Sequence, residues 1–76
     1  MDADVRIDAR GTLCPMPILE LAKAMRALAP GTLVEVVATD RGLEADLPAW
    51  CEATGNPLVR MERREQCYVG WVRKAG

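Results

Sequence analysis

The stretch CPMPILELAKAMRALAPG, residues 14–31, determines how the rest of the chain can fold. Pro15 and Pro17 suit a first helical turn, because the backbone N–H that proline lacks finds no partner there. The apolar residues that follow recur at helical spacing: Ile18, Leu21, Ala22, Met25 and Leu28. Pro30 and Gly31 then stop the helix. We therefore predict an amphipathic helix whose first residue is Pro15.

Strand-like segments flank this helix on both sides. DVRID, residues 4–8, alternates Val5 and Ile7 with polar neighbours, as a half-buried strand does. TLVEVVA, residues 32–38, is rich in β-branched residues and too short for a helix. The order strand, helix, strand predicts a parallel pair of strands joined by a right-handed crossover.

The second half of the chain predicts another helix and a terminal hairpin. We expect the helix between Asp40 and Thr54, with Asp40 and Asp46 capping helical turns. One face of this helix carries Leu43, Leu47, Trp50, Cys51 and Thr54. GNP at residues 55–57 ends the helix. The strand-like runs LVRMERR, residues 58–64, and CYVGWVRK, residues 67–74, then read as a hairpin.

These elements predict a single domain over residues 1–76 with an α+β two-layer sandwich fold, in the order βαβαββ. The sheet would have four strands and be mixed, with both helices on one face. The strands at 32–38 and 58–64 would be parallel, and the hairpin antiparallel. The other face would be more open, with Val59 and Met61 inside and three charged residues outside: Arg60, Glu62 and Arg64.

The composition excludes several classes of function. Ten Lys and Arg against eleven Asp and Glu give a formal charge of -1, which does not indicate a nucleic-acid or membrane protein. The beginning MDADVR lacks the positive charge of a signal peptide, and no apolar run could span a bilayer, so we expect a cytoplasmic protein. Histidine and serine are both missing from the chain, which excludes a Ser-His-Asp or Cys-His catalytic arrangement.

The chain has three cysteines, Cys14, Cys51 and Cys67, without C-x-x-C spacing. We expect free thiols in a reducing compartment and no metal site. Cys51 shares a face with Leu47 and Trp50 and is predicted to lie in the core, and nothing in the sequence activates Cys67.

Cys14 is the candidate nucleophile. With Pro15 as the first helical residue, Cys14 would be the N-cap, at the positive end of the helix dipole and near the N–H of Met16. This placement predicts a stabilised thiolate with a lowered pKa, to which Arg10 could contribute from the preceding loop. A lone cysteine is more often an inert, buried apolar residue. A hydroxyl would cap a helix better than a thiol, so a cysteine at this position suggests that the sulfur itself is needed. A thiolate without a general base can accept sulfur from a persulfide and hand it on.

The pattern D-x-x-G-x-x-C-P-x-P, with Asp8, Gly11, Cys14, Pro15 and Pro17, resembles the signature of the TusA/SirA family of sulfur carrier proteins. The likeness extends over nearly the whole chain, through Pro30-Gly31 and ATDRGLEADLPAWC to VRKAG. It implies the family's two-layer βαβαββ sandwich. Many members have Glu between the two prolines, where this chain has Met16.

The resemblance implies a sulfur carrier rather than a turnover enzyme with its own substrate pocket. Cys14 would receive a persulfide sulfur from a cysteine desulfurase or a rhodanese-type donor and pass it to an acceptor protein, without a cofactor. Asp8, Gly11 and the two prolines would support the loop and helix start. Three residues would contribute to partner docking: Met16, Lys23 and Arg26.

Two alternatives stay open at this stage. A non-catalytic module could bind RNA or a regulatory protein on the open sheet face through basic residues, although few aromatic side chains are available for base stacking. The basic residues are Arg60, Arg64, Arg73 and Lys74, and the aromatic ones are Trp50, Tyr68 and Trp71. A thiol-disulfide oxidoreductase would need Cys51 or Cys67 close to Cys14.

Overall fold

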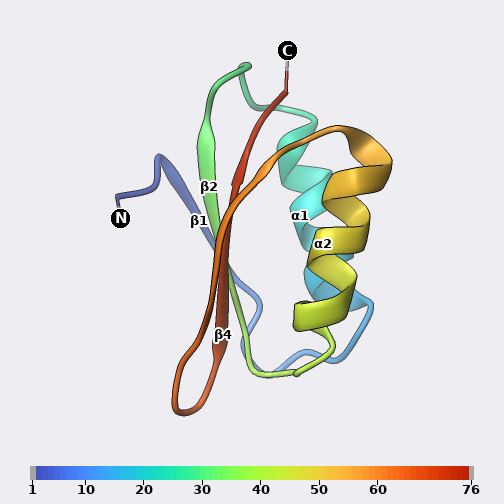
Figure 1. Ribbon diagram of the computed structural model, residues 1–76, viewed down its shortest axis with the longest axis vertical. Coiled ribbons are helices and arrows are strands. Elements are labelled where there is room, and N and C mark those ends of the chain that lie inside the picture. Colours follow the sequence, from blue (N-terminus) through green and yellow to red (C-terminus); the bar gives the residue numbers. More distant parts are fainter. Residues whose placement is uncertain (1, 76) are drawn as a thin grey trace.

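The computed structural model describes residues 2–75 and has the predicted order of elements. These are β1 (Val5–Asp8), α1 (Met16–Met25), β2 (Leu33–Ala38), α2 (Leu43–Thr54), β3 (Leu58–Arg63) and β4 (Tyr68–Arg73). Both helices lie side by side on the same face of one mixed sheet (Figure 1). The predicted α+β two-layer sandwich is therefore confirmed.

The strands are arranged in the order β1-β2-β4-β3. β1 and β2 are parallel neighbours, with Val5 opposite Val34 and Ile7 opposite Val36. β4 is antiparallel to both β2 and β3. β2 and β3 consequently run in the same direction, as predicted, but the C-terminal strand lies between them.

α1 is shorter than predicted at both ends. Pro15 is the N-cap residue and the helix begins at Met16, one residue later than expected. The helix ends at Met25, after which the backbone N–H of Leu28 donates to the Met25 carbonyl at 3.2 Å in a tighter turn. Pro30 has no N–H to donate to the Arg26 carbonyl and disfavours the helical conformation at Ala29, which limits how far an α-helix could continue. Leu28 still packs against the core, as its spacing predicts.

The helix layer and the sheet share the larger part of the core. α1 buries Leu21 and Met25 against β-branched residues of the sheet, and α2 buries three residues of the predicted face: Leu43, Leu47 and Cys51. Trp50 packs at the margin of this cluster. Thr54 is the last residue of α2; it is exposed, and its hydroxyl donates a hydrogen bond to the Trp50 carbonyl at 2.8 Å.

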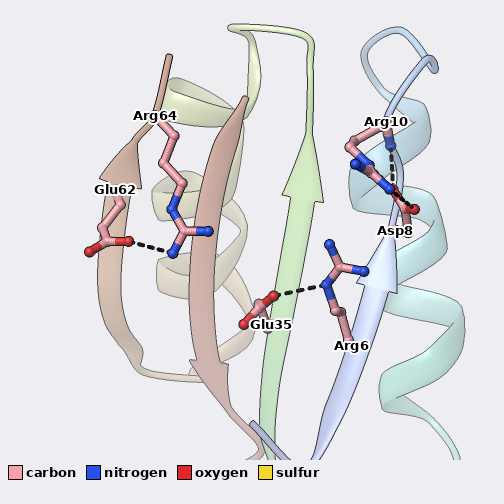
Figure 2. A network of polar contacts seen from close by, with 6 residues as sticks. All are labelled: Arg6, Asp8, Arg10, Glu35, Glu62 and Arg64. Atoms are coloured by element: carbon pink, nitrogen blue, oxygen red, sulfur yellow. Dashed lines mark hydrogen bonds and ion pairs between the residues drawn. The ribbon is translucent and has the colours of Figure 1, made fainter. Parts of the chain in front are cut away.

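The opposite face of the sheet is less open than the sequence predicts. It has a second buried cluster, formed by Leu33, Val37, Val69 and Trp71. Long charged side chains lie over this face, and Figure 2 shows Arg6 paired with Glu35 and Arg64 paired with Glu62. The Arg64 guanidinium also stacks 5.9 Å above the centroid of the Trp71 ring. The apolar stems of these paired charged side chains therefore cover apolar surface of the sheet that would otherwise be exposed.

A β-bulge at Val59 determines which side chains of β3 face the helices. Leu58 is opposite Val72 and Arg60 is opposite Trp71, so one extra residue stands on β3 between these pairs. Val59 is 40% exposed, which makes its predicted inside position wrong. Beyond the bulge, Met61 packs on the helix-side core, as predicted, and Arg60 lies opposite Trp71 of the other face.

Candidate functional site around Cys14

Two loops meet at the edge of the sheet where the parallel strands β1 and β2 both end. Residues 9–15 follow β1, and residues 39–42 follow β2. Ala9 N–H donates to the Val37 carbonyl at 2.7 Å, and Gly11 N–H donates to Thr39 Oγ1 at 2.9 Å. The sheet thus holds the loop that carries Cys14 beside the loop that leads into α2.

A tight turn brings the chain from β1 to Cys14. Gly11 has φ of 83°, a left-handed conformation that glycine adopts without steric strain. The Thr12 hydroxyl donates to the Ala9 carbonyl at 2.7 Å and closes the turn. Gly11 has the structural role expected for the motif glycine.

Cys14 contacts two carboxylates, one in the loop before α2 and one in the first turn of α2. Its backbone N–H donates to Asp40 Oδ2 at 2.7 Å, and its Sγ donates to Asp46 Oδ2 at 2.5 Å. The other oxygen of Asp40 accepts the N–H of Gly42 at 2.9 Å. A Cβ at Gly42 would lie 3.3 Å from the Cys14 Cβ, so the two loops are in close contact. The thiol itself is exposed.

The predicted stabilisation of a Cys14 thiolate is wrong. Cys14 is not the N-cap, and the N–H of Met16 donates to the Leu13 carbonyl at 2.8 Å. The hydrogen bond to Asp46 raises the pKa of the Cys14 thiol, and partial shielding from water and the negative charges of Asp46 and Asp40 act in the same direction. The resting group is therefore the protonated thiol at neutral pH.

Arg10 does not support the thiolate. Its Nε and Nη2 donate to the two carboxylate oxygens of Asp8, each at 2.8 Å (Figure 2). These hydrogen bonds hold the pKa of the Asp8 carboxyl well below its usual range. The prediction for Arg10 is wrong because a carboxylate two residues away offers a bidentate partner. Asp8 therefore stabilises the loop by binding Arg10, and does not act on the start of the helix.

Exposed apolar side chains lie near Cys14 in the sequence, on its loop and on the first turns of α1. Leu13 is 74% exposed, Met16 is 42% exposed and Leu19, one turn further along α1, is 53% exposed. Lys23 and Arg26 are also exposed, but they lie at the other end of α1, roughly 10–15 Å from Met16 along the helix axis. Pro17 is buried in the first turn of α1 and anchors it to the core.

The other cysteines lie in different environments. Cys51 is 5% exposed in the helix-side core, as predicted, and burial raises its pKa to about 11. Cys67 packs against the buried cluster on the opposite face of the sheet and lines a groove with Asp8 and Arg10. All three thiols are free.

Residues 2–75 contain no group of three or more Cys, Asp or Glu side chains arranged to hold a metal ion. Within the same residues, neither helix has the length and apolar character needed to cross a membrane.

The basic residues of the sheet are engaged within the chain, which weakens the RNA-binding alternative. Arg60 and Arg64 both pair with Glu62, and Arg73 Nη1 donates to the Gly31 carbonyl at 2.8 Å. Trp71 is 2% exposed and lies beneath Arg64. A stacking surface for bases needs exposed aromatic rings, and this one is covered.

Sequence reasoning missed the contacts of Asp40 and Asp46 with Cys14. Asp40 does accept a backbone N–H before α2, as a capping residue would. Asp46 lies in the first turn of α2 and its carboxylate faces Cys14, so the cap predicted for it is wrong. The parallel pairing of the first two strands was the available signal, because the loops after parallel neighbours emerge at the same edge.

A sequence model of the family described as "Sulfurtransferase TusA" matches residues 5–74. The chain belongs to the TusA family. The chain is 39% identical over 71 residues to the sulfur carrier protein TusA of Pseudomonas aeruginosa, and this match covers 93% of the chain and 90% of that protein. It is 40% identical over 76 residues to YrkF of Bacillus subtilis, by its name a candidate sulfur carrier protein. The chain spans 41% of the length of YrkF.

The fold has a solved counterpart. The crystal structure of a SirA-like protein from Desulfitobacterium hafniense superposes with a TM-score of 0.80. The superposition covers 95% of this chain and 99% of that protein, at 23% sequence identity. This likeness concerns the fold and agrees with the two-layer architecture.

Proposed function

We propose that this protein is a sulfur carrier in which Cys14 takes up a sulfane sulfur from a donor protein as a persulfide and passes it to an acceptor protein. One observation carries the proposal: in a TusA-family chain, the motif cysteine is an exposed free thiol on a loop held by both parallel strands. An exposed thiol can reach into a donor's active site, which a buried one cannot.

The transfer needs neither an oxidant nor a cofactor. The Cys14 sulfur, as thiolate, attacks the outer sulfur of a neutral donor persulfide, so that an Sγ–S bond forms and the donor's S–S bond breaks. The electron pair of the broken bond leaves with the donor thiolate, which takes up the proton that Cys14 released. Delivery to the acceptor repeats the exchange, with the acceptor thiolate attacking the outer sulfur on Cys14.

The surroundings of Cys14 favour a protein as its partner. Leu13, Met16 and Leu19 form an apolar rim that a donor or acceptor could cover, since exposed apolar clusters mark interaction sites. Lys23 and Arg26 would extend this surface at the far end of α1 toward an acidic region of the partner. A cysteine desulfurase or a rhodanese-type protein would be the donor.

Mass spectrometry of sulfur loading tests the proposal. The protein is incubated with a cysteine desulfurase and cysteine, or with a rhodanese and thiosulfate, and then alkylated and digested. We expect one added sulfur on Cys14 in the unmodified protein and in a Cys51→Ala/Cys67→Ala variant, and none in Cys14→Ala. Absence of the adduct with both donors, or equal loading of Cys14 and Cys51, would overturn the proposal.

A further inference from the structure

The Cys14 thiol has a specific partner that a persulfide on the same residue cannot keep. In the empty protein, Sγ carries the hydrogen that it donates to Asp46 Oδ2. After loading, Sγ is bonded to carbon and to the outer sulfur and has no hydrogen to donate. The hydrogen bond that holds the empty site is therefore lost on loading.

The charges around the site also disfavour the loaded state. Persulfides are more acidic than thiols, so the outer sulfur is largely anionic at neutral pH. The charged groups that act on Cys14 are Asp46 of α2 and Asp40 of the loop before it, and Arg41 acts on Asp40. A second negative charge beside two carboxylates is disfavoured. Loading therefore replaces the neutral S–H group that faces Asp46 with a negatively charged persulfide.

The position of Asp46 is fixed by elements on both sides. Asp46 belongs to the first turns of α2, and its backbone N–H donates to the Gly42 carbonyl at 2.9 Å. Asp40 binds the Cys14 and Gly42 N–H groups together, which fixes the separation between the Cys14 loop and α2. The backbone of Asp46 is therefore held beside the Cys14 loop, within reach of the thiol.

We propose that Asp46 is a positioning residue that holds the empty carrier as a thiol and disfavours the loaded persulfide, so that the carrier readily gives up its sulfur. This inference rests on the proposed sulfur-carrier function. The weak hold would suit a relay, because a carrier that bound sulfur tightly would not release it to an acceptor.

The test compares Asp46→Asn with Glu44→Gln. Both substitutions remove one carboxylate charge from the first turn of α2, but the Glu44 carboxylate faces Arg63 at 3.3 Å. The first measurement is the rate of Cys14 alkylation by iodoacetamide as a function of pH. We expect the Asp46→Asn profile to move to lower pH, with a rate near neutral pH that rises about tenfold for each unit of the shift. Glu44→Gln should match the unmodified protein.

The second measurement is the loaded fraction of Cys14 in mixtures of glutathione persulfide and glutathione. We expect Asp46→Asn to be loaded more fully and to release sulfur to glutathione more slowly than Glu44→Gln. Asp46→Ser is a second neutral variant, for use if Asp46→Asn does not fold.

The outcomes separate this inference from the proposed function. If the neutral variants at Asp46 alkylate with the same pH profile as Glu44→Gln, the role of Asp46 is overturned, whether or not Cys14 accepts sulfur. If the unmodified protein never loads, the proposed function fails, and the alkylation profile still decides whether Asp46 holds the thiol.

Discussion

Gly70 of β4 lies directly beneath Leu47 of α2, and a Cβ at Gly70 would overlap the Cδ2 of Leu47. The Met61 sulfur would be 3.2 Å from the same Cβ. The missing side chain at Gly70 is therefore what allows α2 to pack this closely on the sheet.

Gly70→Ala is expected to lower the free energy of unfolding by about 1–3 kcal/mol, because an extra methyl group overpacks the core. Urea unfolding measures this value. Leu47→Ala alone should cost about 2–5 kcal/mol through the cavity that it leaves. In the Leu47→Ala background the Gly70→Ala cost should nearly vanish, since the space is then free. Additive costs in the double variant would contradict the contact.

Asp40 should make the stability depend on pH on the acidic side. Hydrogen bonds from the Gly42 and Cys14 N–H groups lower the pKa of the folded-state carboxyl. A lowered folded-state pKa means that Asp40 stabilises the fold above its unfolded-state pKa of about 3.9, and that this contribution is lost as the pH falls through the folded value. Thermal unfolding is measured at a series of pH values. The unmodified protein should have a higher Tm than Asp40→Asn near neutral pH, and this difference should shrink in acid. A Tm difference that is constant with pH would contradict this role.

Met16→Asn and Leu13→Asn should slow sulfur uptake from a donor protein by about tenfold, equivalent to about 1.4 kcal/mol, because a polar group replaces the apolar contact beside the thiol without adding a charge. Val59→Asn is the matched control, since Val59 is also exposed and apolar but lies on the opposite edge strand. Uptake from glutathione persulfide should be similar in all three variants, because a small donor does not need the rim. Equal slowing by Val59→Asn would argue against a docking role.

Cys51 should be alkylated only through opening of the helix layer. It is 5% exposed, and burial raises its pKa to about 11, so both access and the thiolate population are small. Peptide mapping after timed exposure to iodoacetamide should show that Cys14 is modified first. Urea should accelerate the modification of Cys51. Modification of Cys51 as fast as Cys14 in the native protein would contradict the packing of α2.

The fold was largely predictable because its strongest signals are local. Helical spacing from Ile18 to Leu28 and the β-branched run before Thr39 each depend on neighbouring residues only. The bulge at Val59 was not predictable, since it follows from the register in which β3 pairs with β4 and not from the sequence of β3 alone. The strand order was not predicted, because nothing within one segment places β4 beside β2.

The candidate site was predictable in its nucleophile but not in its electrostatics. Pro15 and Pro17 locate the start of α1 to within a residue, and this small displacement is enough to remove Cys14 from the N-cap. The pKa of Cys14 then depends on Asp46, which is 32 residues away in the sequence. Arg10 is close in sequence but is already bound to Asp8. Local spacing therefore identified the thiol, and only the tertiary contact could identify its partner.

The bulge at Val59 makes the chain tolerant of the loss of one particular codon. Val72 and Trp71, which lie opposite Leu58 and Arg60, are consecutive on β4, whereas Leu58 and Arg60 are separated by Val59. Deleting Val59 would make Leu58 and Arg60 consecutive as well, so both residues could keep their partners and their faces of the sheet in a ladder without a bulge. A deletion elsewhere in β3 would instead shift the register of the hairpin.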